Sequence, residues 1–449
     1  MKYGSREPRL QRDINLFEAT IYGIGLILGA GIYALIGKVV GIAGNATWMA
    51  FLLAAGIATM TGLSYAELAS TFPKSAAEFT YVKEAYNKKI FSFSVGWILI
   101  FSGFFSIATI AIGFGGYFIG LTGYSGNPIS SIIIVAIILI ILLSLVNFIG
   151  IEESAKLNII FTFIEAAGII LIIVLGFSNL GNISINFLEF PVSTSNIFLA
   201  LLSAAALIFF AYIGFEDIAN ISEETENPTK TIPRALILSI LITTILYILM
   251  AVAVVGSGVS NLELSPNPLS AIAQSFLGPA GALVMSIIAL FATANTVLIM
   301  LIVGSRMMYG MSIAGALPKI FSKVHRKTST PWVAIIFTMI VAIGFVFFGD
   351  IELVARVCVF AVFLVFFIVN ITLIYLRKTQ PDLERPFKVK PSIKWIPIFP
   401  LIGAITCFLM FFSFIESYWI FIIQLIVIAI GLGFYGIQLL NNRRRKNLK

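Results

Sequence analysis

The feature that most constrains this sequence is a glycine-rich interruption within its first long apolar run. Four glycines occupy the nine positions from Gly23 to Gly31, and the apolar run continues on both sides of them. Each glycine costs a helix interior roughly 1 kcal/mol relative to alanine, so this spacing predicts a break in the helix. Inside a bilayer, broken backbone persists only where protein buries it or where it lines a watery cavity. The interruption therefore predicts a polar site at mid-membrane depth.

The composition supports the membrane location on which that argument depends. Of the 449 residues, 59% are hydrophobic and 11% are charged, which is too apolar for an ordinary soluble domain. Apolar runs of about 20 residues, the length that crosses a hydrocarbon core, recur about twelve times. We therefore expect an all-α integral membrane protein with about twelve transmembrane helices and short connecting loops.

The positive charges indicate how the chain is oriented. Lysine and arginine exceed aspartate and glutamate by 29 to 21, but they fall in alternate loops. The intervening loops, such as 120–127 and 178–196, carry no lysine or arginine. This asymmetry is the positive-inside pattern, which predicts a multi-pass protein of the cell membrane with both termini cytoplasmic. It also explains the basic excess without nucleic acid as a partner.

Side chains that perform catalysis or bind metals are scarce. His325 is the only histidine and sits beside two cations in a loop, and the two cysteines, Cys358 and Cys407, lie inside apolar runs rather than at paired loop positions. No nucleotide-binding P-loop is present. We therefore expect no enzyme, no catalytic residue, no metal site, no cofactor and no pump driven by ATP.

The sixth apolar run repeats the interruption of the first. Between Leu207 and Asp217, Gly214 and the acids Glu216 and Asp217 interrupt an otherwise apolar helix. Interrupted spans at corresponding places in two halves are typical of transporters built from inverted repeats. The expected organisation is a cytoplasmic segment (1–14), a first repeat of five helices (15–177), an inverted repeat of five helices (178–376), two further helices (377–440) and a basic cytoplasmic tail (441–449).

Two helix breaks of opposite polarity predict a ligand that carries both charges. The half-helix that begins at Ala30 and Gly31 would present free N–H groups and a positive dipole end, which suit a carboxylate. The half-helices that end near Ile27 and Ala211 would present free carbonyl groups, which suit an ammonium group. Together they predict an amino acid. The alternative is that the glycines only allow close helix packing, as small-xxx-small motifs do.

Four motifs in order along the chain resemble the amino acid-polyamine-organocation superfamily, and within it the cationic amino acid transporter-like branch. They are 28–33 followed by 41–44, 64–75, 210–216 followed by 227–234, and 306–318 followed by 330–331. This resemblance spans almost the whole chain. It implies the leucine-transporter-type fold, with a 5+5 inverted repeat and discontinuous helices 1 and 6. It also implies secondary amino acid transport by alternating access, as a symporter or an exchanger.

The resemblance assigns roles to the residues at the two breaks. The implied substrate-binding residues are Ala30, Gly31 and Ile32 as amide donors to the carboxylate, Ile27, Phe210, Ala211 and Ile213 as carbonyl acceptors for the amino group, and Gly29 and Gly214 beside them. Phe210 would also be an aromatic gate over the substrate.

One departure from the family pattern concerns ion coupling. Proton-coupled relatives often carry a lysine in the fifth helix, whereas the matching position here holds Glu165. An ionisable group within a span marks a function by default, so Glu165, and secondarily Glu216, are candidate coupling residues. The expected coupling ion is H⁺ rather than Na⁺, although Thr293 and Thr296 would suit Na⁺. The alternative is a purely structural glutamate.

The nature of the substrate stays open at this stage. The family branch suggests arginine, lysine or ornithine, whereas small neutral amino acids such as alanine or serine are equally compatible with the residues. A transporter of polyamines or other organic amines is one alternative function, and a non-transporting amino acid sensor of the same fold is another. Membrane lipid is the other expected partner, and the sequence does not predict an oligomeric state.

Overall fold

The computed structural model describes residues 14–74, 77–122, 128–149, 154–181, 184–191, 196–222, 225–325, 328, 330–348, 350–415 and 417–447. The expected N-terminal segment, apart from Ile14, lies outside the described residues, as do Ser75 and the side chains of the C-terminal tail.

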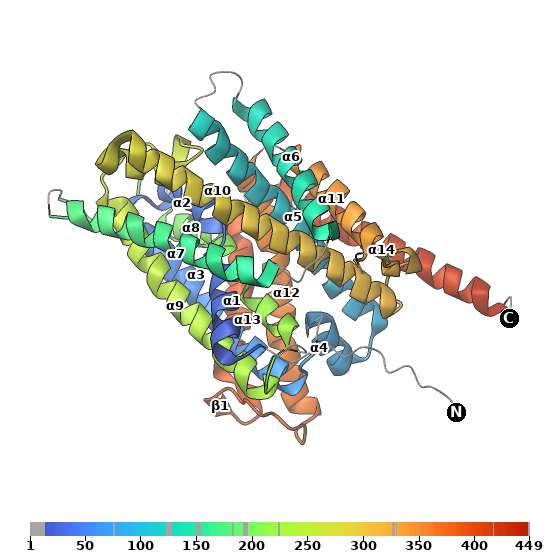
Figure 1. Ribbon diagram of the computed structural model, residues 1–449. Helices are drawn as coiled ribbons and strands as arrows, with labels where there is room; N and C mark the ends of the chain where they lie inside the picture. Colours follow the sequence, from blue (N-terminus) through green and yellow to red (C-terminus); the bar gives the residue numbers. More distant parts are fainter. Residues whose placement is uncertain are drawn as a thin grey trace.

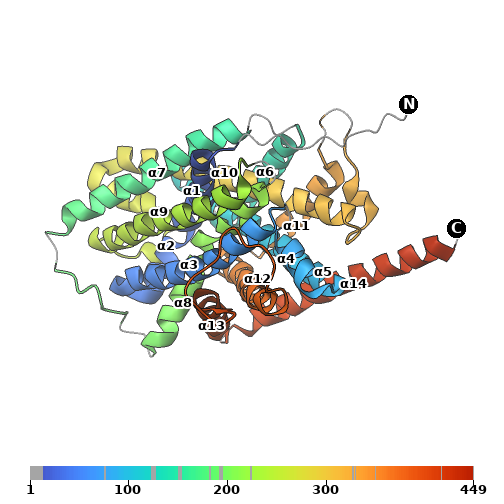
Figure 2. The same cartoon turned by 90° about the horizontal axis from the view of Figure 1, so that it is seen from below.

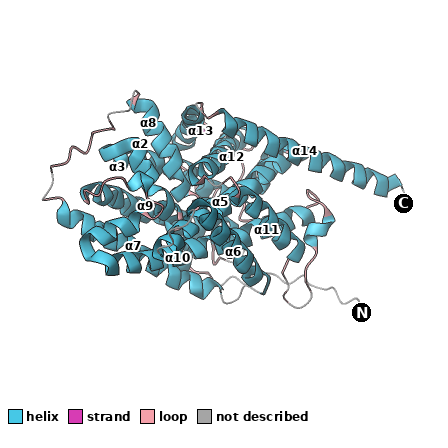
Figure 3. Ribbon diagram, turned by 90° about the horizontal axis from the view of Figure 1, so that it is seen from above, coloured by secondary structure: helices cyan, strands magenta, loops and turns pink. Residues whose placement is uncertain are grey.

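Helices make up almost all of the described chain (Figures 1 and 3). The α-helices are α1 (Leu16–Leu28), α2 (Gly31–Ala43), α3 (Thr47–Thr71), α4 (Ala77–Tyr86), α5 (Lys89–Thr122), α6 (Pro128–Ile149), α7 (Ser154–Asn179), α8 (Ile197–Phe209), α9 (Pro228–Gly256), α10 (Pro268–Ile313), α11 (Trp332–Val346), α12 (Ile351–Thr379), α13 (Ile398–Met410) and α14 (Tyr418–Asn447). Short 3-10 helices are η1 (Gly44–Ala46), η2 (Phe210–Tyr212), η3 (Phe215–Ile221), η4 (Leu262–Leu264), η5 (Lys319–Ser322) and η6 (Phe411–Phe414), and a hairpin pairs β1 (Ser392–Ile393) with β2 (Ile396–Pro397).

The helices confirm an all-α, multi-pass membrane protein. Within the described residues, nine helical segments are long and apolar enough to cross a bilayer, and α1, α11 and α13 with its 3-10 extension are shorter apolar helices. The first of the nine segments, Gly31–Thr71, joins α2 to α3. The first predicted span is thus divided, because its helix ends at Leu28 and begins again at Gly31.

The core of the bundle is organised around α5. In its most apolar stretch, 94% of residues are buried, against 28% in the corresponding stretch of α6. α10, α12 and α6 pack around α5, while α3 packs on α9. Figure 2 shows α12, α13 and α14 along one side of the bundle, and α14 extends beyond it in Figures 1 and 3. The outer helices present apolar side chains to lipid, as their composition requires.

Polar side chains join α3 to α12 inside this apolar bundle. Asn370 on α12 accepts a hydrogen bond from the Ser64 hydroxyl at 2.5 Å and donates to the Thr61 hydroxyl at 3.1 Å. Further along the same helices, the buried Glu67 carboxylate accepts a hydrogen bond from Arg377 Nε at 2.8 Å. Because no water reaches these polar groups, they form their hydrogen bonds with side chains on the neighbouring helix.

α12 carries an ion pair near its beginning and a buried cysteine further along. Glu352 and Arg356, four residues apart near the beginning of the helix, form an ion pair at 2.8 Å, as the spacing predicts. Cys358 on α12 and Cys407 on α13 are both buried and free, so they act as packing residues.

Candidate functional site

The first helix break lies where the glycines predict it. α1 ends at Leu28, Gly29 has φ −40° and ψ −176°, and Ala30 precedes the first residue of α2. Gly29 and Ala30 are buried, as are the last six residues of α1. The last carbonyl groups of α1 and the first N–H groups of α2 therefore lie in the protein interior without helical partners.

The second break lies in the sixth apolar run. α8 ends at Phe209, η2 follows, and Ile213 is extended before the chain reaches Gly214 at φ 119°. A side chain is strained at that φ, and a Cβ on Gly214 would lie 3.0 Å from the carbonyl oxygen of Leu26. Gly214 is thus needed both for the turn and for the close approach of the two interrupted helices.

The two breaks meet in space. A Cβ added to Gly31 would lie only 2.8 Å from Ala211 Cα and 3.1 Å from Phe210 Cδ1. The hydroxyl of Tyr247, on α9, donates to the carbonyl of Ile27 and also lies 3.1 Å from the carbonyl of Ala211. One hydroxyl group therefore links the carbonyl ends of both interrupted helices.

The amide donors at the beginning of α2 differ in their partners. The Ala30 N–H donates to Thr296 Oγ1 at 3.1 Å, and that hydroxyl donates in turn to the Ala292 carbonyl of its own helix at 2.9 Å. The N–H groups of Gly31 and Ile32 have no hydrogen-bond partner among the described residues. Two of the three predicted donors are therefore free to bind a ligand, and the third is held by α10.

A cavity lies between the two breaks. The space between atoms there amounts to about 220 Å³, including the part that opens to solvent. The predicted residues that line it are Ile27, Gly29, Gly31, Phe210, Ala211 and Ile213, and they are joined by Leu26, Ser106, Ile110, Thr296 and Met300. No charged side chain lines this cavity. Ala30, Ile32 and Gly214 lie at the breaks without lining it, and Phe210, the predicted gate, lines it with a side chain that is almost fully buried.

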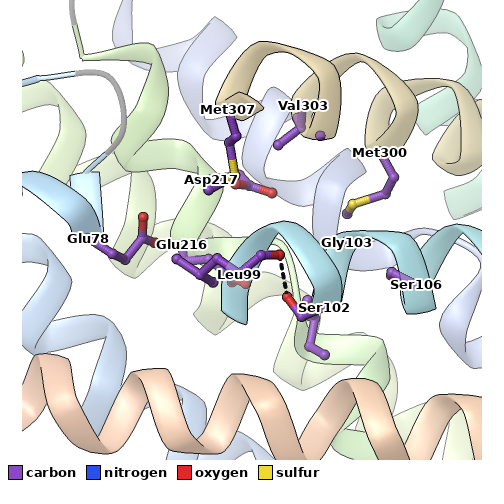
Figure 4. Close-up of a pocket in the computed structure, with 12 residues that line it drawn as sticks. Glu78, Leu99, Ser102, Gly103, Ser106, Glu216, Asp217, Met300, Val303 and Met307 are labelled. Atoms are coloured by element: carbon purple, nitrogen blue, oxygen red, sulfur yellow. Dashed lines mark hydrogen bonds between the residues drawn. The ribbon is translucent and has the colours of Figure 1, made fainter. Parts of the chain in front are cut away.

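A second cavity of about 480 Å³ adjoins the first, and both are lined by Ser106, Ile213 and Met300. It has a different character, because Glu78, Glu216 and Asp217 line it. Figure 4 shows these carboxylates at one end and Ser106 and Met300 at the other. An acidic compartment therefore lies next to the space between the helix breaks, and Ser106, Ile213 and Met300 border both.

Each of these three carboxylates is fixed by a neutral hydrogen-bond donor. Glu216 accepts from the Gly214 N–H at 2.9 Å, so its carboxylate caps the second break. Asp217 accepts from the Asn220 amide at 3.0 Å, and Glu78 accepts from the Tyr65 hydroxyl at 3.0 Å.

Within the described residues, no lysine, arginine or histidine forms an ion pair with any of the three. Burial, together with the charge of Asp217, raises the pKa of the Glu78 carboxyl to about 7.

Glu165 lies outside both cavities. It is fully buried on α7, where its Oε1 accepts a 3.4 Å hydrogen bond from Asn295 on α10 and its Oε2 has no hydrogen-bond partner in the part of the chain that the structure describes. Its backbone carbonyl accepts from the hydroxyl of Tyr33, on α2, at 2.6 Å. Glu165 thus contacts a half of the interrupted helix through its backbone, and it has a buried carboxylate oxygen without a partner.

Two residues of the site carry no signal in the sequence. Tyr247 lies in an apolar stretch of α9 and resembles any buried aromatic residue, and Ser106 is one of several serines on α5. Thr296, which together with Thr293 would suit Na⁺, accepts a hydrogen bond from the Ala30 amide and donates to the Ala292 carbonyl of its own helix. Thr293 donates back to the Ala289 carbonyl of its own helix at 2.6 Å, as isolated threonines in spans usually do.

Comparison with known proteins gives one consistent result. Residues 14–433 match the amino acid permease family. The chain is 30% identical to a branched-chain amino acid permease of Bacillus subtilis over 96% of this chain and 94% of that protein. It is 28% identical to a methylthioribose transporter of the same bacterium, over 95% and 93% of the two chains. It is also 30% identical to the human cystine/glutamate transporter, over 91% and 81%.

The family match covers nearly the whole described chain, including both helix breaks, and the similarity to the branched-chain amino acid permease is equally extensive. The chain therefore belongs to the amino acid permease family of the amino acid-polyamine-organocation superfamily.

Proposed function

We propose that this protein is a secondary amino acid transporter that works by alternating access. The observation that carries the proposal is the cavity between the two interrupted helices, because Gly31 at the beginning of α2 lines it together with Ile27 and Ala211 at the carbonyl ends of the two breaks. The full proposal includes twelve spans arranged as a 5+5 inverted repeat plus two helices, in the plasma membrane with both termini cytoplasmic. Family membership and the short apolar helices α1, α11 and α13 support it.

The substrate would bind through its α-carboxylate and α-amino groups. The carboxylate would accept hydrogen bonds from the Gly31 and Ile32 N–H groups at the positive end of α2. The amino group would donate to the carbonyl groups of Ile27 and Ala211, with Tyr247 turning its hydroxyl away or toward the carboxylate. Phe210 would then close over the bound molecule.

The cavity lining favours a neutral aliphatic amino acid. Ile110 of α5, Met300 of α10 and Ile213 of the second break give the cavity apolar walls, and Ser106 and Thr296 are its polar side chains outside the breaks. A charged substrate side chain would lose its hydration there without gaining a partner, at a cost of several kcal/mol. A branched-chain amino acid permease among the relatives supports the same substrate class.

The acidic compartment would be the route to the cytoplasm. Release through it would carry the substrate's ammonium group past Glu216, Asp217 and Glu78, each of which attracts a cation. The same compartment favours one second candidate function, transport of an organic amine without a carboxylate. Such a substrate would depend on the three acids more than on the amides of α2.

We also propose that Glu165 couples transport to H⁺. Its partnerless oxygen is the feature that supports this role, because a protonated carboxyl would tolerate that position better than a carboxylate. Tyr33 and Asn295 connect Glu165 to α2 and to α10, so a change in its protonation would alter contacts on both helices. Glu216, held by the backbone of the second break, is the second candidate.

Uptake into proteoliposomes tests the main proposal. Labelled leucine, alanine, arginine and putrescine would be offered with a pH gradient, with a sodium gradient, and with a protonophore. We expect leucine or alanine uptake that the protonophore reduces. Absence of uptake or exchange of all common amino acids would refute the transport function, and preferred uptake of putrescine would favour the second candidate.

A glutamine substitution tests the coupling residue separately. In Glu165→Gln, we expect exchange of internal for external substrate to persist while accumulation driven by the pH gradient is lost. Glu352→Gln is the matched control, because it makes the same chemical change at a carboxylate paired with Arg356. Accumulation that survives in Glu165→Gln would remove Glu165 from the coupling mechanism.

A further inference from the structure

A hairpin and the basic loop that leads to it lie between the apolar helices α12 and α13, away from both cavities. α12 ends at Thr379, α13 begins at Ile398, and β1 and β2 form the hairpin immediately before α13. Figure 1 places β1 at the lower end of the bundle. Because the apolar helix α13 begins directly after β2, we place the hairpin at the boundary between membrane and water.

Buried charges hold the loop that leads to the hairpin. The carboxylate of Glu67 on α3 accepts a hydrogen bond from the Val389 N–H at 2.8 Å and also pairs with Arg377. Arg377 reaches onward to the Ser392 hydroxyl at 2.7 Å, in the first strand of the hairpin. Arg385 donates to the Gln380 carbonyl at 2.8 Å, which closes the end of α12.

This anchored loop displays its cations outward. Residues alternate along the extended segment, so that Val389 is buried while Lys388 and Lys390 are exposed. Lys394 occupies the turn of the hairpin at φ 55°, and Lys378 lies over the ring of Trp395 at 5.2 Å from its centroid. No carboxylate of the described residues forms an ion pair with any of these four lysines, although Asp382 and Glu384 are exposed earlier in the same loop.

Two large apolar side chains stand exposed among these lysines. Ile393 is 66% exposed and Trp395 is 37% exposed, both at the tip of the hairpin. Tryptophan is enriched at the level of lipid headgroups, where its apolar ring is buried and its N–H stays wet. Exposing the apolar Ile393 side chain to water is unfavourable and nothing nearby offsets it, whereas the outer part of a lipid leaflet would bury this side chain.

We propose that this surface, which we name the lysine platform and define as Lys378, Lys388, Lys390, Ile393, Lys394 and Trp395, binds anionic phospholipid of the adjoining leaflet. The lysines contact lipid phosphates while Ile393 and Trp395 enter the headgroup region. The charge is complementary to an anionic leaflet, to which each nearby lysine adds attraction. Lipid bound there would be linked to α3 and α12 through the buried Glu67 and Arg377, which hold the loop in place.

The test uses the full chain in vesicles and places a fluorophore on the hairpin tip. Ile393→Cys is labelled with an environment-sensitive dye; Cys358 and Cys407 are fully buried and stay unlabelled. The vesicles contain phosphatidylcholine and phosphatidylglycerol, and either one or the other carries brominated acyl chains that quench the dye. Both leaflets have the same composition, so the orientation of the inserted protein does not affect the result.

We expect brominated phosphatidylglycerol to quench the dye more than brominated phosphatidylcholine does, and added salt to reduce the difference. The triple variant Lys388→Gln, Lys390→Gln and Lys394→Gln should lower this preference about tenfold or more. The matched control removes three exposed lysines near α4, as Lys83→Gln, Lys88→Gln and Lys89→Gln, and should keep the preference.

Three outcomes would overturn the proposal. The first is equal quenching by the two lipids, and the second is an equal loss of preference in both triple variants. The third is a dye that no lipid quenches, which would place the hairpin in water and favour a soluble protein as its partner. The salt dependence is measured on the labelled protein with all its lysines, so the proposal stays testable even if a triple variant fails to fold.

Discussion

Gly31→Ala is the sharpest test of the interrupted-helix site, because it adds one methyl group at the contact between the two breaks. The added carbon would lie 2.8 Å from Ala211 Cα and 3.2 Å from Ala211 N. Backbone atoms cannot rotate away as a flexible side chain does, so α2 and the η2 segment have to separate. Overpacking of this kind typically costs about 1–3 kcal/mol.

Moving α2 and η2 apart would displace the backbone groups that are proposed to bind the ligand. If the strain has to be overcome whenever the substrate closes the site, a cost of about 1–3 kcal/mol corresponds to a roughly 5- to 150-fold loss of apparent affinity. Initial rates of leucine uptake into proteoliposomes, measured over a range of concentrations, would give KM and Vmax. We expect KM to rise by such a factor, and uptake to become unmeasurable in Gly31→Val.

Gly56→Ala is the matched control. Gly56 lies inside α3 with no atom within 4 Å of the position of an added Cβ, so alanine should be accommodated and should even favour the helix by roughly 0.5–1 kcal/mol. Wild-type KM in Gly31→Ala, at equal expression and melting temperature, would refute the inference that the two breaks form one tightly packed binding site.

Three further substitutions test separate parts of the structure. Tyr247→Phe removes the hydroxyl that links the two breaks and should lower both stability, by about 1–3 kcal/mol, and uptake; an unchanged melting temperature and rate would contradict this. Glu67→Gln leaves Arg377 buried without its counter-charge, and thermal unfolding should reveal a loss of about 3–5 kcal/mol. Because burial raises the pKa of Glu78 from 4.5 to about 7, the folded protein keeps a proton there that the unfolded chain has released. Stability should therefore fall by about 3 kcal/mol as pH rises through that window and stay level above it, and Glu78→Gln should flatten this slope in melting curves.

The positions of both breaks could be predicted because their signals are local. The clustered glycines around Gly29, and the glycine and two acids that follow Ile213, each disfavour an apolar helix within a stretch of a few residues. Within a membrane, such non-helical backbone is tolerated only where it is buried in protein or lines a cavity. Sequence spacing alone therefore placed the site at two segments far apart in the chain, and the structure brings these segments into contact.

The residues that contact the breaks could not be predicted, because they come from helices whose sequence carries no signal against helix formation. Tyr247 and Thr296 fit their helices as ordinary buried residues, and only the fold brings one to the carbonyl of Ile27 and the other to the amide of Ala30. The Ala30 N–H, predicted to donate to the substrate, is therefore already occupied in this structure. Thr296 would first have to release that amide, so the Ala30 N–H serves the ligand only if α2 moves relative to α10.

The three carboxylates of the acidic compartment act together in a way that none of them indicates alone. Taken alone, Glu216 is a cap for the second break, and Glu78 is one of several polar residues beside a loop. Their approach at one cavity, with Asp217, creates a buried negative region that no described cation neutralises. Carboxylates held together in this way repel one another, so the compartment is stable only when a proton or a passing ammonium group reduces its charge. If the proposed route is correct, substrate release and proton occupancy compete for the same three side chains, and the rate of release should rise as the cytoplasmic side becomes more acidic.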